Sequence, residues 1–591
     1  MRSDGLRQCK LDLTIDLIGV LLMSEDIFKE EISKHIADAL GVAVADIYDL
    51  LELPRDRKMG DLALPCFTLA KQMKQSPQQI AALISEKLSK VAWQKMSHAS
   101  AIGPFVNFFY KTPELAAHIV KNIRAVGAGF GLADEGQRQK ILIDFSSPNI
   151  AKPFGIGHLR STVIGNALYH IFEKLGYECI GINHLGDWGT QFGKMIVAYR
   201  EWGSEEMLEE DPVHALFDLY TKFHREAKSR PDLDEEARRQ FRLLEHGDAE
   251  AIELWGRFKR YSLAEFNRIY DMLGIKFDYF TGESFYNDKM DAVLRILDDK
   301  HLTKISQEAL IVDLEEYDLG ACLLKKGDDA TLYATRDLAG ILFRHQEFDF
   351  VRCLYVVGAA QSLHFKQVFK VIELIGYDYA DRLVHVPFGW VRFEDKAMST
   401  REGNIIFLEE VIAQSRDLAR NIILEKNPEI EDIDGTAEAI GVGAVIFAQT
   451  SVRRMKDIDF KWETALSFEG ETGPYLQYTH ARLCSLGRKF GKDIPDSIDF
   501  GLLKEEEEKH VLSSLMQYPE RIRQAAREYE PFVISSYLIS LAQEFNTYYQ
   551  KHRVITDNTS LSEARMTLCD CVRIILADGL RILGIVPLER M

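Results

Sequence analysis

Residues 146–162 read SSPNIAKPFGIGHLRST, and this stretch determines how the chain around it is expected to fold. The apolar run at 141–145 predicts a strand before it, and the apolar spacing at 163–175 predicts a helix after it. A glycine-bearing turn between a strand and a helix N-terminus directs backbone N–H groups and the positive end of the helix dipole toward phosphate oxygens. The stretch therefore predicts a nucleotide-binding turn, in which Gly157 leaves room for a flat base and His158 is presented to the phosphates.

Five strand-like runs alternate with helical patterns around this turn: 141–145, 178–183, 309–313, 350–357 and 382–391. Such alternation predicts a doubly wound, parallel, Rossmann-like α/β sheet. A second segment, residues 396–404, reads KAMSTREGN and is expected to join the turn in one active site. Together the two segments indicate ATP chemistry.

Five segments in order resemble the class I aminoacyl-tRNA synthetases, and within that class the arginyl-tRNA synthetase family. They are residues 146–162, 183–193 (NHLGDWGTQFG), 333–337 (YATRD), 473–482 (GPYLQYTHAR) and 583–591 (LGIVPLERM). A single glycine-rich turn is weak evidence for a family, but five segments in the order typical of the family make the resemblance specific. The resemblance implies ATP-dependent activation of L-arginine and its transfer to the 3′-terminal adenosine of tRNA(Arg), with release of AMP and pyrophosphate. ATP would bind as a substrate with Mg²⁺, and neither a permanently bound cofactor nor a protein metal site is expected.

The resemblance also implies roles in phosphate chemistry. His158 would donate to phosphate oxygens, and Lys152 would offer a cation to the α-phosphate or the substrate carboxylate. Catalytic roles are implied for His158, Lys152, Lys396, Ser399 and Arg401, and ATP contacts for Gly155, Gly157, His158, Met398 and Ser399. An alternative for His158 is a helix-capping or surface histidine.

Two departures from the class pattern affect these roles. Gly155 stands where a first histidine is common, and residues 397–401, AMSTR, lack both usual lysines. In arginyl members the lysine before the first signature, here Lys152, is thought to substitute. Lys396 and Arg401 remain as neighbouring cations that could reach pyrophosphate.

A guanidinium requires planar, bidentate acceptors. Asp337 and Tyr333 are four residues apart in a predicted helix, so they share one face. The resemblance implies that both contact the guanidinium with Glu283, while Asn149 and Gln361 hold the α-amino end with Ser147 nearby. His184, Asp187 and Trp188 would line the pocket or the adenosine, although Trp188 suits core packing equally well.

The chain is expected to divide into four parts. Residues 1–23 form an extension, disordered or due to an upstream start, and 24–135 form an N-terminal α+β domain that binds the tRNA elbow. Residues 136–410 form the catalytic domain, with a helical insertion at about 195–300, and 411–591 form an all-α anticodon-binding bundle.

Several residues are candidates for tRNA contact: Phe105, Asn107 and Phe109 in the N-terminal domain, and Arg453, Arg454, Tyr548 and Tyr549 in the bundle. Cations beside aromatic rings suit unpaired bases. The competing interpretations are core packing for Phe105 and Phe109 and ordinary solvated faces for the bundle clusters. Residues 505–508, EEEE, predict a solvated helix face.

Composition limits the function classes. A formal charge of −19 argues against binding nucleic acid through an overall positive field, but local basic patches remain compatible with tRNA. The eight cysteines lack zinc spacing and predict a reducing cytoplasm. We expect a cytoplasmic monomer that does not contact membranes.

Two other functions fit part of the pattern. A class I nucleotidyl transferase, or a synthetase for another amino acid, would use the same turn, but a neutral substrate would leave Asp337 and Glu283 as buried, unpaired charges. A catalytically silent, synthetase-like RNA-binding protein would explain the missing histidine and lysines. Pyrophosphate exchange with and without tRNA separates it from an enzyme.

Overall fold

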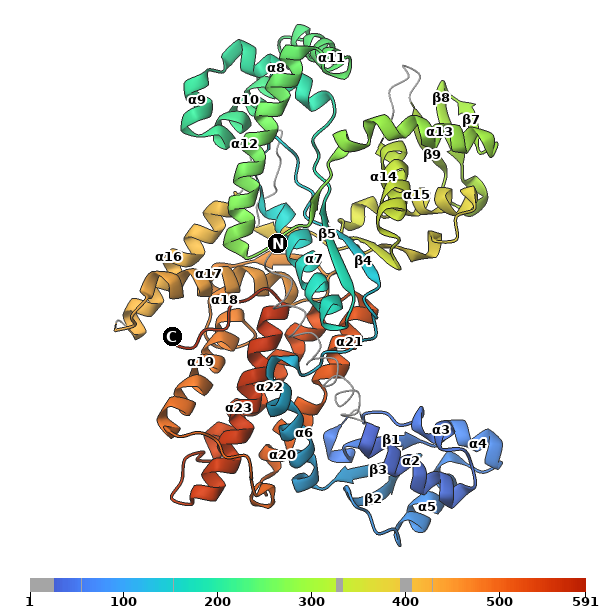
Figure 1. Ribbon diagram of the computed structural model, residues 1–591, viewed down its shortest axis with the longest axis vertical. Coiled ribbons are helices and arrows are strands. Elements are labelled where there is room, and N and C mark those ends of the chain that lie inside the picture. The colour runs from blue at the N-terminus through green and yellow to red at the C-terminus, as the bar shows by residue number, and fades with distance from the viewer. Residues whose placement is uncertain (1–25, 55, 153, 326–332, 394–406, 428) are drawn as a thin grey trace, which may run out of the picture.

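A five-stranded parallel sheet lies at the centre of the molecule (Figure 1), with strands in the order β11-β10-β4-β5-β6. The computed structural model describes residues 26–591 except 55, 153, 326–332, 394–406 and 428. The strands are β4 (Lys140–Asp144), β5 (Glu178–Asn183), β6 (Tyr279–Phe280), β10 (Arg352–Tyr355) and β11 (Leu383–His385). The predicted doubly wound parallel sheet is confirmed, and the strand order reverses between β4 and β10.

Three helices connect and cover this sheet: α7 (Ile156–Lys174), α14 (Tyr333–Phe348) and α15 (Ser362–Ile375). The predicted helix after the glycine-bearing turn is α7, which is buried along most of its length because the sheet and the C-terminal helices both pack against it. Ligands bind at the carboxyl ends of strands where a parallel sheet reverses its order. The loop before α7 and the loop before α15 meet that condition.

Two predicted strands do not belong to this sheet as expected. Residues 309–313 form β8 (Ala309–Asp313), but it pairs antiparallel with β7 (Thr303–Ser306) and β9 (Ala321–Lys325) in a separate sheet. Gln307 and Glu308 both have positive φ, which makes a tight hairpin turn without the usual glycine or asparagine signal. The run at 382–391 is also divided, because β12 (Val391–Phe393) pairs with β13 (Ile458–Phe460) instead.

Helices form an insertion between β5 and β6, at the upper left of Figure 1. They are α8 (Thr190–Trp202), α9 (Glu205–Glu210), α10 (Pro212–Glu226), α11 (Asp232–Glu245) and α12 (Ala249–Leu273). Asp248 caps the start of α12, and Gly274 ends it in the left-handed conformation. A further helix, α13 (Met290–Asp299), follows β6.

The N-terminal region combines helices with an antiparallel sheet in the order β1-β3-β2. Its elements are α2 (Asp26–Leu40), α3 (Val44–Tyr48), β1 (Leu62–Pro65), α4 (Phe67–Met73), α5 (Pro77–Leu88), β2 (Met96–Ile102) and β3 (Phe105–Tyr110). The next helix, α6 (Thr112–Val126), packs against the C-terminal helices α20 (Glu506–Met516) and α23 (Thr559–Ile582). The N-terminal sheet is therefore attached to the rest of the chain through a helix that lies on the bundle.

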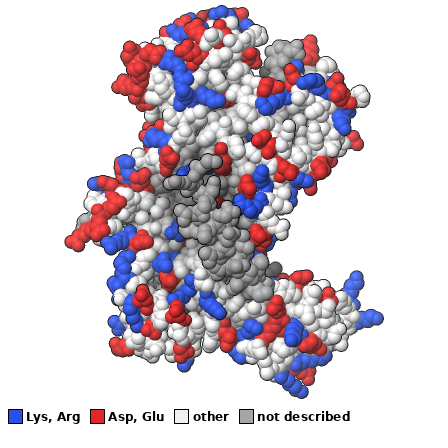
Figure 2. All heavy atoms as spheres, in the orientation of Figure 1, with Lys and Arg blue, Asp and Glu red and all other residues white. Residues whose placement is uncertain are grey.

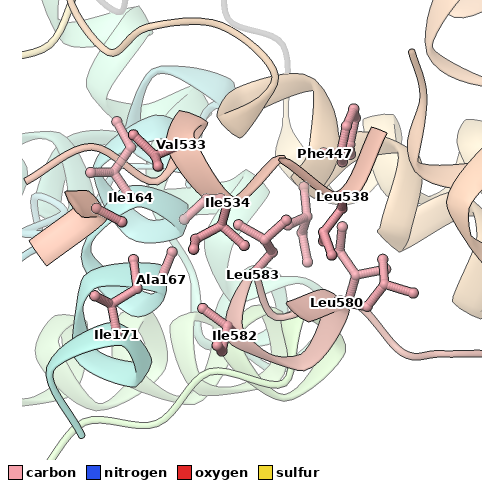
Figure 3. Packing of buried hydrophobic residues seen from close by; sticks show 14 of the residues in the cluster. Ile164, Ala167, Ile171, Phe447, Val533, Ile534, Leu538, Leu580, Ile582 and Leu583 are labelled. Atoms are coloured by element: carbon pink, nitrogen blue, oxygen red, sulfur yellow. The ribbon is translucent and has the colours of Figure 1, made fainter. Parts of the chain in front are cut away.

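The C-terminal part is helical apart from β13. Its helices are α16 (Leu408–Lys426), α17 (Ile433–Thr450), α18 (Trp462–Ala465), α19 (Gly473–Phe490), α20 (Glu506–Met516), α21 (Tyr518–Glu528), α22 (Phe532–Lys551) and α23 (Thr559–Ile582). Figure 3 shows apolar side chains of α7 beside those of α22 and the end of α23, all within one continuous core. The helix α7 and the bundle therefore share a core.

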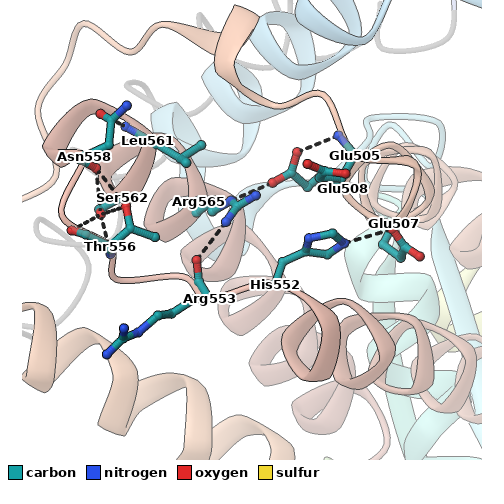
Figure 4. Close-up of polar contacts among 10 residues, drawn as sticks. All are labelled: Glu505, Glu507, Glu508, His552, Arg553, Thr556, Asn558, Leu561, Ser562 and Arg565. Atoms are coloured by element: carbon teal, nitrogen blue, oxygen red, sulfur yellow. Dashed lines mark hydrogen bonds and ion pairs between the residues drawn. The ribbon is translucent and has the colours of Figure 1, made fainter.

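The solvated face predicted for residues 505–508 is wrong for Glu508, whereas Glu505 and Glu506 are exposed as predicted. Glu508 is fully buried, and its Oε1 accepts a 2.8 Å bond from Nε of Arg565 (Figure 4). Its carboxylate also closes a capping box with Glu505 at the start of α20. One member of an acidic run can therefore be an internal partner, because a buried carboxylate is stabilised by a paired arginine.

Charge is unevenly distributed over the surface. Figure 2 shows acidic side chains gathered at the outer end of the insertion, and basic and acidic side chains interspersed over the bundle. No helix in the described ranges is long and apolar enough to span a bilayer.

Candidate active site

Loops from four parallel strands meet at the carboxyl edge of the central sheet. Asn149, after β4, forms a parallel bridge with Gly186, after β5. A Cβ on Gly186 would lie 2.2 Å from Oδ1 of Asn149, so only glycine permits this approach. The N–H of Glu283, after β6, donates to the carbonyl of Leu185. Gly358, after β10, is bridged to Phe388, so the edge is joined by backbone contacts.

The turn after β4 is held in an unusual conformation. Ser146 and Ser147 both have positive φ. The N–H of Ser146 donates to Oγ of Ser161, whose hydroxyl donates to the carbonyl of Val356, across the point where strand order reverses. Non-glycine residues in this region persist only where their surroundings fix them, and such strain is frequent at functional sites.

The described geometry places His158 in the first turn of α7, after the N-cap Gly155. Burial, together with the charge of Lys152, lowers the pKa of His158 to about 4, so its imidazole is neutral at pH 7. Its Nδ1 is buried and has no hydrogen-bond partner among the described residues. Beside it, a Cβ added to Gly157 would meet no described heavy atom within 4 Å. A neutral hydrogen-bonding group therefore lies next to open space at a helix N-terminus.

Lys152 lies with its amine 5.2 Å from the centre of the Tyr220 ring, on α10 of the insertion. Lys396, Met398, Ser399 and Arg401 lie outside the described residues. The chain after that segment returns to the turn, because Phe407 bridges Gly155 and the N–H of Leu408 donates to the carbonyl of Phe154.

Two carboxylates, Glu283 and Asp337, interact electrostatically at the carboxyl edge of the central sheet. Burial raises the pKa of Glu283 to about 7, with the charge of Arg336 opposing the rise and those of Asp337 and Asp187 adding to it. Asp337 Oδ2 lies 2.6 Å from Nε2 of His364, at the start of α15. This carboxylate pair, Glu283 and Asp337, concentrates negative charge where a cationic side chain would be stabilised.

The remaining predicted substrate contacts differ in exposure. Tyr333 begins α14 and is 65% exposed, Gln361 is exposed, and Asn149 is half-buried. Ser147 donates to Oδ1 of Asp144, so its hydroxyl hydrogen is already used. Tyr333 is near enough for the charge of Glu283 to raise its pKa, although burial contributes more.

Asp187 supports the site from behind, and Trp188 adopts the core packing that was its alternative interpretation. Asp187 is fully buried and accepts from the N–H and hydroxyl of Ser284 and from Lys259, so it fixes the loop that carries Glu283. Trp188 packs against Trp255 and Phe241 of the insertion. His184 contacts the carbonyl of Thr281 through Nδ1, at 3.0 Å.

Sequence reasoning missed the partners that hold these groups. Arg336 Nη1 lies 3.8 Å from Glu283, His364 contacts Asp337, and Arg344 pairs with the buried Asp144 at 2.7 Å. Arg336 could have been found from the sequence, because it adjoins Asp337 in the 333–337 segment. His364 and Arg344 lie outside every quoted segment, and only the packing of α14 and α15 reveals them.

Two of the residues expected to contact tRNA are buried in this structure. Asn107 is 1% exposed within the N-terminal sheet, and Tyr548 is 0% exposed within the bundle. Tyr548 lies on the inner face of α22, which packs against the core. Asn107 instead shares one face of β3 with Phe105 and Phe109, and it is covered there by the chain at Gly60. Phe105 and Phe109 are half-buried, and Phe109 stacks on His98.

The two arginines of the first bundle cluster also differ in exposure. Arg453 is exposed, whereas Arg454 is half-buried and donates to the carbonyl of Pro387 at 2.7 Å. Tyr549 is half-buried, and its ring lies 5.7 Å from the guanidinium carbon of Arg482.

A cavity of about 690 Å³ opens beside Tyr549 among α16, α17, α19 and α22, next to the C-terminus. Its wall includes Tyr475, Tyr478, Arg482 and Met591. A second cavity of about 570 Å³ shares Tyr478, Arg482 and Met591 and adds Arg488, Lys489 and Arg590. Together they form what we call the bundle groove. The 473–482 segment pointed to it, but no role was assigned to its side chains.

Arg482 organises this groove. Its guanidinium carbon lies 4.8 Å from the centre of the Tyr478 ring, and it donates to Oδ1 of Asn546 at 3.1 Å. Aromatic rings beside an arginine stack unpaired bases, and the neighbouring cations attract phosphates.

The described residues contain no group of three or more His, Cys, Asp or Glu side chains placed to hold a metal ion. Mg²⁺ commonly binds through substrate phosphates and only one or two carboxylates, so this arrangement is compatible with an ion carried by a nucleotide.

Three family models match the chain. Residues 121–462 match tRNA synthetases class I (R), catalytic domain, residues 476–591 match the DALR anticodon binding domain, and residues 26–110 match the arginyl tRNA synthetase N terminal domain. The catalytic match contains the carboxyl edge, and the DALR match contains part of the bundle groove.

Curated relatives match over nearly the whole length. The chain is 44% identical over 565 residues to arginine–tRNA ligase of Clostridioides difficile, covering 95% of this chain and 100% of that protein. It is 46% identical over 568 residues to arginine–tRNA ligase 1 of Bacillus cereus, covering 95% and 99%. Its fold resembles Thermus thermophilus arginyl-tRNA synthetase, with a TM-score of 0.80, 24% identity and coverage of 95% and 99%.

Proposed function

Since the chain belongs to the class I arginyl-tRNA synthetase family, we propose that its carboxyl-edge site activates L-arginine with ATP and transfers it to the 3′-terminal adenosine of tRNA(Arg). The observation that carries the amino-acid choice is the carboxylate pair at that edge. Glu283 is largely buried with its pKa raised to about 7, and Asp337 lies close enough to add to that rise.

A guanidinium offers planar donors that match two carboxylates. Without such a cation, the pair leaves negative charge in a poorly solvated place, which is costly. With arginine bound, Glu283 ionises and both carboxylates gain charge-assisted hydrogen bonds. A neutral side chain of similar size would neither ionise Glu283 nor form charge-assisted hydrogen bonds. The carboxylate pair would therefore select the amino acid by its charge.

Activation requires the arginine carboxylate to attack the α-phosphorus of ATP as pyrophosphate leaves. Little covalent help is needed, because alignment and stabilisation of charge on phosphate oxygens lower the barrier. We assign phosphate contact to the neutral His158, which would donate an N–H, and to the ammonium of Lys152. Mg²⁺ would arrive on the nucleotide and supply charge neutralisation there.

Asn149 and Gln361 would hold the α-amino end, and Tyr333 would close the guanidinium end. Asn149 is suited to this role because its loop is fixed against Gly186 by the bridge between β4 and β5 ends. Ser147, already donating to Asp144, would act through an acceptor lone pair or by shaping the turn.

For tRNA, we propose that the bundle groove takes unpaired anticodon bases. Tyr478 and Arg482 would stack and hydrogen-bond a base, while Arg488, Lys489 and Arg590 would contact phosphates. Phe105 and Phe109 remain candidate elbow contacts, and Arg453 and Tyr549 remain candidates in the bundle.

The test is aminoacylation by the purified chain with labelled arginine, ATP–Mg²⁺ and total tRNA. We expect acid-precipitable arginyl-tRNA that depends on ATP, with citrulline and lysine inactive at equal concentration. Citrulline is the sharper control, because it keeps the length and planarity of arginine but lacks the charge. Charging of citrulline at a comparable rate would contradict recognition by the carboxylate pair.

The groove is tested in the same assay. Arg482→Ala should raise KM for tRNA about tenfold or more, on the scale of ~1–3 kcal/mol for a lost stacking contact, with KM for arginine unchanged. Arg416→Ala serves as the control, because Arg416 is an exposed residue of α16 and is paired only with Asp417 among the described contacts. Equal KM values for tRNA in the two variants would exclude the groove.

A further inference from the structure

Arg160 is a fully buried arginine with no carboxylate partner among the described contacts. Its side chain is 0% exposed, and Nη1 donates to the carbonyls of Gly389 at 2.9 Å and Trp390 at 3.2 Å. Nη2 donates to the carbonyl of Lys456 at 2.7 Å. Burial lowers the pKa of Arg160 to about 10, although the charges of Asp457 and Glu530 oppose this change. A buried guanidinium whose hydrogen bonds go only to neutral carbonyls is costly, so its placement calls for an explanation other than stability.

Its position in the helix gives a first clue. Arg160 lies two residues after His158 in α7, which turns the two side chains toward different sides of the helix. His158 lies at the open nucleotide turn, whereas Arg160 enters the junction between the catalytic domain and the bundle. The two side chains therefore share the same rigid helical turn.

The two segments that Arg160 holds are also joined to one another. The N–H of Gly389 donates to the carbonyl of Arg454, and that of Trp390 donates to Oδ1 of Asp457. From there the strands β12 and β13 run parallel. Gly389 is pressed against this segment so closely that a Cβ would lie 2.6 Å from Oδ1 of Asp457.

The junction continues into the bundle. The N–H of Arg454 donates to Oε1 of Glu530, between α21 and α22, at 3.0 Å. Glu530 is itself buried, at 6% exposure. A continuous set of hydrogen bonds thus leads from the bundle, through Arg454 and the carbonyls of the junction, to Arg160.

We propose that Arg160 is a positioning residue for amino-acid activation: its guanidinium fixes the first turn of α7, and with it His158, on the junction with the tRNA-binding bundle. This inference rests on the proposed function, because it assigns His158 a phosphate contact. Arg160 touches no reacting atom and acts through the helix turn. A planar, multidentate guanidinium can hold carbonyls of two segments in one geometry, which a lysine ammonium does poorly.

The test compares Arg160→Lys and Arg160→Ala with matched variants of Arg565, a second buried arginine, whose partners Glu508 and Arg553 lie wholly within the bundle. The rate of tRNA-dependent arginine activation is measured per active site, with active sites counted by titration. In Arg160→Lys we expect kcat to fall at least about tenfold, because His158 would shift from its productive position. The KM values for arginine and ATP should stay within about threefold of those of the parent. Arg565→Lys should unfold at lower temperature with kcat per site unchanged.

Chemical rescue separates positioning from folding. Guanidinium ion at tens of millimolar should raise kcat per active site of Arg160→Ala severalfold and leave that of Arg565→Ala unchanged. The proposal requires both the kcat loss and this rescue. A kcat per site within twofold of the parent in Arg160→Lys, an equal loss in Arg565→Lys, or absence of rescue overturns it. An inactive parent enzyme would instead contradict the proposed function itself.

Discussion

Nε2 of His364 lies 2.6 Å from Oδ2 of Asp337, so the residue proposed to select arginine is held by the first turn of the neighbouring helix α15. This contact fixes one oxygen of the carboxylate and leaves the other available. It also joins α14 to the helix that follows β10, beside the point where strand order reverses. The amino-acid site and the nucleotide turn are therefore built on the same edge.

Arginine use should depend on pH through Glu283. Burial raises the pKa of its carboxyl to about 7, so the group is largely neutral below that pH, whereas a guanidinium binds the anion. The value of kcat/KM for arginine should therefore rise as pH increases from 6 to 8 and then level off. Glu283→Gln should remove this rise and lower the plateau. A parallel rise in the variant would assign the titration to another group.

The same shift predicts the opposite effect of pH on stability. A raised carboxyl pKa means that the unfolded chain loses its proton first, so the contribution of Glu283 to stability falls between about pH 4.3 and pH 7. Glu283→Gln should flatten this part of the pH dependence of unfolding by denaturant in the absence of arginine. An unchanged slope would show that the pKa is not raised.

Phosphate chemistry should depend on Lys152 more than on Lys396. Lys152→Ala should slow adenylate formation by two or more orders of magnitude, on the order of 3 kcal/mol of lost charge stabilisation. Lys396→Ala should cost much less, because residues 397–401 lack both usual lysines. Single-turnover measurements rank the two variants, and the reverse order would return the catalytic cation to the second segment.

The buried pair of Lys174 and Asp578 should hold α7 on the bundle. Nζ of Lys174 lies 2.8 Å from Oδ2 of Asp578, and both side chains are nearly buried. Lys174→Met should lower the free energy of unfolding by ~3–5 kcal/mol, because it leaves a buried charge uncompensated. Lys492→Met, which breaks an exposed pair with Glu563, should cost less than ~1 kcal/mol. Similar denaturation midpoints for both variants would contradict this difference.

Arginine activation should require bound tRNA. The second segment lacks both usual lysines, and the bundle is hydrogen-bonded to the catalytic domain through Arg454, which donates to the carbonyl of Pro387, so tRNA binding energy could complete the ATP site. Pyrophosphate exchange should appear only with tRNA and weaken as salt increases, because tRNA contacts release counterions. Substantial arginine-dependent exchange by tRNA-free enzyme would falsify this coupling.

The sequence predicts the parts of the fold that have strong local signals. The turn at 146–162 and the parallel strands follow from apolar runs and glycine. The antiparallel pairing of β8 does not, because its hairpin turn at Gln307 and Glu308 uses residues that rarely adopt positive φ. Likewise Glu508 lies in an acidic run, and only its tertiary contact with Arg565 reveals that it is internal.

The candidate site was predictable in part for a related reason. Asp337 and Glu283 could be named from the resemblance, and both lie at the carboxyl edge. Their supporting residues, Arg336 and His364, depend on how α14 and α15 pack, which local patterns do not encode. The burial of Tyr548 could not be predicted, because an aromatic residue type does not indicate which face of a helix it occupies. Asn107 shares a face of β3 with Phe105 and Phe109, and only the tertiary contact with the chain at Gly60 shows that it is covered.

The most direct test of arginine selection by the carboxylate pair is kinetic. Asp337→Asn replaces one charge-assisted acceptor by a neutral one, worth ~1.5–3 kcal/mol, and Asp349→Asn, on an exposed residue just after α14, is the matched control. In steady-state aminoacylation, kcat/KM for arginine should fall about 10- to 150-fold in Asp337→Asn, with KM for ATP within about twofold of the parent. An unchanged kcat/KM for arginine, or an equal loss in Asp349→Asn, would remove Asp337 from the site and contradict the account.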